Sequence, residues 1–257
     1  SQATAFVQCL EPRPTPQLRE RALSPVAIVR TGEQDPATAV RFGELDIAQR
    51  LWHGVCGPLE QASIVGAERL LDERGAGAEL TSHAAPDGTV RDPFLILDFG
   101  RPVIGMPEIV LEAPAGTVVE IGYAEKLVDG RVPFCEVPDE ARHSWNDWLH
   151  ADRYVAGEGV QTWRLFEPRT ATRYLHVVFR TGGKPARLRA ARLIAQEYPV
   201  EERGRFECSD PTLNTLWRAA VDTVYLAMED VLSCDSVRER SYYFLAGELE
   251  QHHQTIY

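Results

Sequence analysis

The period of the hydrophobic pattern changes once along the chain, and this change limits the folds that the sequence can adopt. Between Phe94 and Gln196, apolar residues form about seven short runs separated by turn residues. Within 119–123 they alternate with other residues, which is typical of a half-buried strand. The first run, 94–97, is expected to end at the turn-like residues 98–100. The pattern therefore predicts a mainly β fold, an antiparallel β-sandwich of jelly-roll or related type over residues 91–200.

After Gly204 the apolar residues recur with the period of an α-helix, about 3.6 residues. Asp210 suits the N-cap of this helix, and Pro211 suits its first position. A second helix is predicted from about Arg238 to the end of the chain. Two amphipathic helices need partners for their apolar stripes, so they do not make a domain. We therefore expect residues 205–257 to be the first helices of an α-helical domain that continues beyond this chain.

The first ninety residues differ from both of these regions, and we expect them to be a linker and mixed segment that leads from a preceding domain. Residues 25–30 read as an edge strand that stops at Thr31-Gly32, because the surrounding prolines remove ladder donors. Between about Glu44 and Arg74 the spacing of apolar residues predicts helical segments, which are broken at Gly57-Pro58.

Composition excludes several classes of function. The 257 residues include 27 Lys+Arg against 38 Asp+Glu, a net charge of −11, without any basic block, so nucleic acid is not an expected partner. No apolar run approaches the roughly 18–20 residues of a membrane span. The 5 cysteines are scattered without a CxxC pair, which favours free thiols over a metal site. We expect no cofactor. No signal peptide is visible in the sequence as given, and the cellular compartment stays open because a secreted enzyme of this size would not depend on disulfides.

An ordered series of short motifs over roughly residues 90–257 carries a resemblance to a known family. The series resembles the β-sandwich of bacterial α-L-rhamnosidases (glycoside hydrolase family 78), followed by the start of their (α/α)6 catalytic barrel. Its main pieces are Leu97-Asp98-Phe99-Gly100-Arg101, Tyr123-Ala124-Glu125, Phe166-Glu167-Pro168, Arg173-Tyr174-Leu175 and Phe206-x-Cys208-Ser209-Asp210-x-x-Leu213-Asn214-x-x-Trp217.

The resemblance also implies a set of site residues. In the family, a segment Asp-Cys-Pro-x-Arg-[Asp/Glu]-x-Arg-x-x-Trp-x-Gly-Asp supplies the general acid, and Cys234–Tyr243 matches it here. Glu239 is then the expected acid, and the expected sugar-binding residues are Asp235, Arg238, Arg240, Tyr243 and Glu248. This chain departs from the pattern because Asp235 is displaced by one residue, the proline is absent and Tyr243 stands in the place of Trp. These departures leave the sugar specificity open.

Three further candidate residues for sugar binding can be explained by a structural role as well as by a functional one. Asp230, at the end of the first helix, is either a sugar-binding carboxylate or a polar helix end. Trp145 and Trp148 lie in a long excursion between strands and suit stacking on sugar rings, but their i, i+3 spacing also suits a short docking helix. The run Arg238–Arg240 is otherwise a solvated surface run. His252 and His253 point about 100° apart on a helix, so we expect no metal site.

The expected function is hydrolysis of terminal α-L-rhamnosyl linkages with inversion, which needs an acid and a base about 6.5–9.5 Å apart. The substrate is then a rhamnoside. The rest of the catalytic domain, including the base, is expected beyond Tyr257 or from another chain, so this chain alone should be inactive. A homo-oligomer stays open. The alternatives are a non-catalytic carbohydrate-binding sandwich and a related (α/α)6 glycosidase for another sugar.

Overall fold

A computed structural model describes residues 16–35, 47, 51–52, 54–72, 74–133, 150–168, 170–229 and 233–237. Within these ranges the chain forms twelve strands, a short 3₁₀ helix η1 and one long α-helix, α2. Their bounds are β1 Arg19–Leu23, β2 Ala27–Gln34, β3 Cys56–Gly57, β4 Ser63–Val65, η1 Ala67–Leu71, β5 Ala78–Thr81, β6 His83–Ala84, β7 Val90–Ala113, β8 Val118–Ala124, β9 Ala151–Val155, β10 Gly159–Arg164, β11 Ala171–Arg180, β12 Ala186–Glu197 and α2 Pro211–Ala227.

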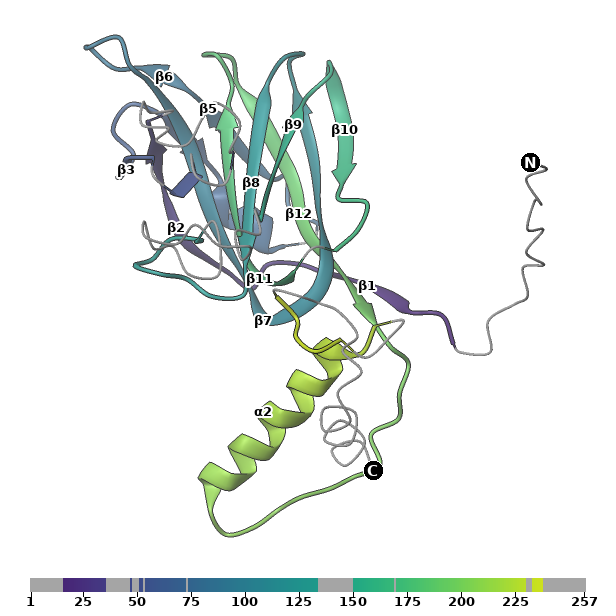
Figure 1. The fold of residues 1–257 in the computed structure, drawn as a ribbon. Coiled ribbons are helices and arrows are strands. Elements are labelled where there is room, and N and C mark those ends of the chain that lie inside the picture. Colours follow the sequence, from purple (N-terminus) through teal and green to yellow (C-terminus); the bar gives the residue numbers. More distant parts are fainter. Residues whose placement is uncertain are drawn as a thin grey trace, which may run out of the picture.

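The long strand β7 is shared by the two layers of a sandwich (Figure 1). Its N-terminal half pairs with β2 and β11, and that layer continues from β11 to β8 and β9. Its C-terminal half pairs with β10 and β12, and that layer continues from β12 to β1, β5 and β4. All of these pairs are antiparallel, so the predicted antiparallel β-sandwich is confirmed.

The core of the sandwich lies between the layers and is made by alternate residues of each strand. Leu97, Leu111, Leu175 and Leu188 are fully buried in one cluster. Several of the residues between the inward-facing ones on the β12 side are charged and pair across strands, as Arg192 does with Glu108 and Arg189 with Glu112. Apolar residues inside and ion pairs outside are the pattern expected for a sheet with one wet face.

The prediction that the first run ends at residues 98–100 is wrong, because β7 continues through them. Gly100 has a φ of 83°, and its N–H donates to Asp98 Oδ1 at 2.7 Å. Arg173 of β11 donates to both oxygens of Asp98, at 2.8 and 2.9 Å, and lowers the pKa of that carboxyl. The turn-forming residues therefore bend one strand between two layers where they were expected to separate two strands.

The described residues before 90 add strands to the sandwich, since β1, β2 and β5 pair with β12 and β7. The predicted stop at Thr31-Gly32 is wrong, because β2 runs on to Gln34. At Gly32 a Cβ would lie 2.3 Å from the Gly57 carbonyl oxygen, so the glycine lets β3 approach. Where the chain divides into domains stays a prediction.

The helical segments predicted between Glu44 and Arg74 are mostly absent from the described part of that region. Ile47, Leu51 and Trp52 are helical, but residues 56–57 and 63–65 are strands and 67–71 form η1. Pairing with β2 and β5 fixes these strands, so their conformation depends on partners outside the segment and overrides the local pattern.

Helix α2 begins as the sequence predicts. Pro211 is its first residue, and Asp210 Oδ1 accepts the Thr212 N–H at 2.8 Å. Only Val221, Val224 and Ala227 of its 17 residues are buried, all in the half nearest the sandwich. The rest of the helix extends away from the sheets (Figure 1). The second predicted helix lies outside the described residues, and no described helix is long and apolar enough to cross a membrane.

Candidate functional site

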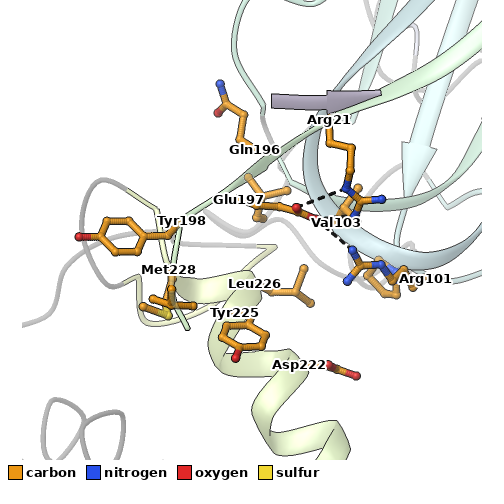
Figure 2. Close-up of a pocket in the computed structure, with 13 residues that line it drawn as sticks. Arg21, Arg101, Val103, Gln196, Glu197, Tyr198, Asp222, Tyr225, Leu226 and Met228 are labelled. Carbon is orange, nitrogen blue, oxygen red and sulfur yellow. Dashed lines mark hydrogen bonds and ion pairs between the residues drawn. The ribbon is translucent and has the colours of Figure 1, made fainter. Parts of the chain in front are cut away.

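A pocket of about 320 Å³ lies where the bend of β7, the end of β12 and the last turns of α2 meet (Figure 2). Val103 of β7 and Leu226 of α2 give it an apolar surface, and Met228 follows the helix on the same side. The last turns of α2 face the sandwich because Val224 and Ala227 are buried there. The pocket therefore lies at the junction between the sandwich and α2.

Charged side chains from three distant segments meet at the edge of this pocket. Glu197 Oε1 lies 2.6 Å from Arg21 Nη2 and 3.0 Å from Arg101 Nη2. Figure 2 shows both guanidinium groups turned toward the same carboxylate. All three side chains are about half exposed, so each pair contributes at most about 1 kcal/mol to stability. The cluster therefore adds little to the free energy of unfolding, and its main effect is to hold three charges in fixed positions at the edge of the pocket.

The arginines determine what Glu197 can do chemically. The hydrogen bond from Arg21 lowers the pKa of Glu197, and Arg101 acts in the same direction. Glu197 is therefore ionised at neutral pH, and it can accept hydrogen bonds from hydroxyl groups but cannot serve as a general acid. Tyr198 and Tyr225 also line the pocket and offer ring faces and hydroxyl groups. Such a mixture of groups suits a polar, hydroxyl-rich ligand.

A short segment, residues 233–237, returns from α2 to the sandwich beside this junction. Ser233 is buried, and its N–H donates to the Ala227 carbonyl at 2.8 Å. The Ala171 N–H, at the start of β11, donates to the Ser236 carbonyl at 2.6 Å. The segment is thus bonded to the helix at one end and to the sandwich at the other.

Asp235 is the one predicted site residue that the structure describes. It is half-buried, its Oδ1 accepts the Val237 N–H at 3.1 Å, and the Cys234 thiol lies 3.6 Å from Oδ2. These bonds shape the local turn. They leave the predicted role of Asp235 in binding sugar as a prediction.

The other predicted site residues lie outside the described residues. They are the general acid Glu239 and the sugar-binding candidates Arg238, Arg240, Tyr243, Glu248, Asp230, Trp145 and Trp148. Among the described residues, no group of His, Cys, Asp and Glu could hold a metal ion.

Sequence reasoning missed the charged cluster of Arg21, Arg101 and Glu197. Arg21 and Glu197 are ordinary charges without a motif around them, and the motif that contains Arg101 does not indicate a charged cluster. They meet because β1 pairs with the end of β12, which places Arg21 opposite Ala195, two residues from Glu197. No pattern along the sequence predicts such a pairing, so the cluster could be recognised only in the folded structure.

Comparison with known proteins agrees with the fold. Residues 88–194 match the family model of the bacterial alpha-L-rhamnosidase concanavalin-like domain. A GH78 family rhamnosidase of Bacillus sp. GL1 is 26% identical, with a TM-score of 0.55 over 76% of this chain and 19% of that chain. A rhamnosidase from Klebsiella oxytoca, solved with rhamnose bound, is 20% identical, with a TM-score of 0.54 over 85% of this chain and 37% of that chain.

The chain therefore spans about a fifth and about a third of the length of these two structures. None of the curated proteins matches it. The family match falls on β7 to β12, the same strands that carry most of the sequence motifs. The resemblance seen in the sequence is confirmed: residues 88–194 match the bacterial alpha-L-rhamnosidase concanavalin-like domain, and the chain is similar in structure to a glycoside hydrolase family 78 rhamnosidase.

Proposed function

We propose that the protein, at its full length, hydrolyses terminal α-L-rhamnosyl linkages with inversion at the anomeric carbon. The observation that carries this proposal is the match of residues 88–194 to the rhamnosidase domain. The Klebsiella oxytoca relative was solved with rhamnose bound, which supports rhamnose as the sugar. Because the chain covers 19% and 37% of the two relatives, we assign the activity to the full-length protein and not to these 257 residues alone.

In this proposal Glu239 is the general acid that protonates the departing oxygen. Glu239 follows Val237, the last described residue of the segment beside the junction, by two residues in the sequence. Arg238 and Arg240 are its neighbours in the sequence, and residues at i−1 and i+1 of a helix do not face the residue between them. Asp235 and Glu248 would offset their positive charge and help to keep Glu239 protonated.

The remaining candidates would bind the sugar. Arg238, Arg240 and Tyr243 can donate hydrogen bonds to hydroxyl groups, and Asp230, Asp235 and Glu248 can accept them. Trp145 and Trp148 would stack on a sugar ring. The general base would come from a part of the protein outside this chain, at about 6.5–9.5 Å from Glu239.

The exposure of α2 supports an enzyme over a self-contained binding module. Leu213 and Leu216 are 47% and 59% exposed, so an apolar side of the helix is uncovered among the described residues. An amphipathic helix is stable when its apolar side packs against another element. A helical catalytic domain that begins with α2 would supply that element.

The test is Glu239→Gln in the full-length protein, assayed on phenyl α-L-rhamnoside, whose poor leaving group needs the proton. We expect kcat to fall by about 10²–10⁴-fold, because the amide cannot supply the proton. Glu201→Gln changes an exposed carboxylate that pairs with the exposed Arg203, and it should leave kcat unchanged. NMR of the first product should show inversion. Full activity of Glu239→Gln would remove the assigned acid.

A binding module would behave differently in two measurements. Residues 16–200, which include the paired strands β1, β2 and β5, would bind rhamnose in a calorimetric titration. The full-length protein would hydrolyse no rhamnoside. Both results together would replace the proposed enzyme with a carbohydrate-binding sandwich.

A further inference from the structure

We propose that the start of β11, residues Thr170–Thr172, positions the catalytic segment, and that the Ala171 N–H does so by holding the Ser236 carbonyl. The inference rests on the proposed role of Glu239, which lies three residues after Ser236. Ala171 would be a positioning residue, because it acts on the acid through the backbone and touches no substrate. The sandwich would then contribute to catalysis indirectly, by positioning the acid.

The bond between Ala171 and Ser236 is made in a water-excluded place. The N–H to carbonyl distance is 2.6 Å, and Ala171 and Thr172 are fully buried, with Thr170 1% exposed. A buried amide that loses its partner finds no water to replace it. The segment that carries Ser236 is therefore held at this point as long as the start of β11 stays in place.

The start of β11 is itself fixed by the sandwich. Ala171 pairs with Ile104, Thr172 pairs with Val103, and the register shifts directly after Thr172. Within this shift, Arg173 donates to both oxygens of Asp98 at 2.8 and 2.9 Å. A strand with such a bulge and a two-pronged ion pair cannot slide along β7 without breaking both.

The helix side of the segment is held as well. The Ser233 N–H donates to the Ala227 carbonyl at 2.8 Å, and the Ser233 hydroxyl bonds Glu229 Oε1 at 3.2 Å. The segment is therefore bonded at Ser233 and again at Ser236, and the second bond fixes the backbone three residues before Glu239 in the sequence.

The experiment removes one hydrogen-bond donor. Ala171→Pro deletes the N–H, and proline is accepted at the first residue of a strand. Ala171→Gly keeps the N–H and is the matched control. Both are made in the full-length protein and assayed on two aryl α-L-rhamnosides, one with a poor leaving group (phenol) and one with a good leaving group (dinitrophenol).

A misplaced acid has a signature that general loss of structure lacks. The poor leaving group needs the proton from the acid, whereas the good one departs largely without it. We expect Ala171→Pro to lower kcat about 10–100-fold for the phenyl substrate and less than about threefold for the dinitrophenyl substrate, with little change in KM. Ala171→Gly should stay within about threefold of the wild type on both.

The outcomes separate this inference from the function on which it rests. A wild-type protein that hydrolyses neither substrate overturns the proposed function and this inference with it. An active wild type with equal kcat values for Ala171→Pro and Ala171→Gly overturns only the positioning role. If Ala171→Pro does not fold, Arg173→Gln, which loosens the start of β11 from Asp98, decides the question. Arg173→Gln should also lower kcat more for the phenyl substrate than for the dinitrophenyl substrate, by a smaller factor than Ala171→Pro. If Arg173→Gln lowers both kcat values equally or lowers neither, the inference is overturned.

Discussion

The sandwich and helix α2 belong to one chain but are stabilised in different ways. In the sandwich, residues from distant strands, such as Leu97 and Leu175, are fully buried against one another. In α2 only three residues are buried, and Leu216 is 59% exposed. The sandwich therefore depends on contacts far apart in sequence, whereas α2 depends on local signals and on a partner for its apolar side. We therefore expect the boundary between these two differently stabilised regions to be a boundary between two functions as well.

The largest expected effect contrasts an apolar residue in each region. Phe179 of β11 is fully buried, and Phe179→Ala should lower the free energy of unfolding by about 3–5 kcal/mol because it leaves a cavity. Leu216→Ala in α2 should change it by less than about 0.5 kcal/mol. Urea unfolding followed by tryptophan fluorescence measures both. Similar losses for the two variants would mean that α2 is packed as tightly as the sandwich.

Within the sandwich, a buried ion pair and an exposed ion pair should also differ in their contribution to stability. Glu120 of β8 is fully buried and accepts hydrogen bonds from Arg153 and from Arg180, the latter at 2.6 Å. Glu120→Gln would leave Arg153 without this buried counter-charge and would leave Arg180 with Asp92 alone, and we expect a loss of about 3–5 kcal/mol.

A matched exposed pair serves as the control for Glu120. Glu79 lies 3.3 Å from Arg187, and both side chains are more than 40% exposed. Glu79→Gln should cost less than about 0.5 kcal/mol. If Glu120→Gln were as mild as Glu79→Gln, the two arginines would have to be solvated, and the buried charges would not belong to the core.

The sequence was informative where the structure depends on neighbours along the chain. Alternation of apolar residues identified the sandwich, and the Asp210-Pro211 signal identified the start of α2. The path of β7 was not predictable, because the turn-like residues Asp98 and Gly100 become a bend only when Arg173 pairs with Asp98. The strands β3 and β4 are too short to have a period of their own.

The candidate site divides in the same way. The segment Cys234–Tyr243 was found from its spacing in the sequence, although only its first four residues are described. The cluster of Glu197 with Arg21 and Arg101 was not found, because these residues lie far apart in the sequence and meet only in the folded chain. The bond from Ala171 to Ser236 joins two backbones, and a backbone contact leaves no trace in residue types.

The pH dependence of stability should be larger for the sandwich than for α2. His176 of β11 is fully buried against Phe94, and burial lowers its pKa from 6.5 to about 3, with Arg131 and Arg30 acting in the same direction. Below pH 6.5 the unfolded chain takes up this proton and the folded chain does not, so stability falls as the pH falls. The expected loss between pH 6.5 and 5 is about 2 kcal/mol.

His176→Leu should remove this part of the pH dependence. Asp92, whose pKa is raised by burial, contributes with the opposite sign, but it is present in both proteins and cancels in the comparison. The measurement is urea unfolding at pH 5, 6 and 7 for both proteins. Parallel pH profiles for the wild type and His176→Leu would show that His176 is solvated or paired when it is protonated.

The smallest effect tests whether α2 and the sandwich unfold together. Asp210→Ala removes the cap on Thr212 and should weaken the first turn of α2 by about 1 kcal/mol, whereas Asp210→Asn retains an acceptor. Amide exchange in the first turn should speed up in the alanine variant, while urea unfolding of the sandwich stays the same. If unfolding of the sandwich weakens by the same amount, helix and sheets form one cooperative unit. The exposed side of α2 would then need a different explanation from a missing partner.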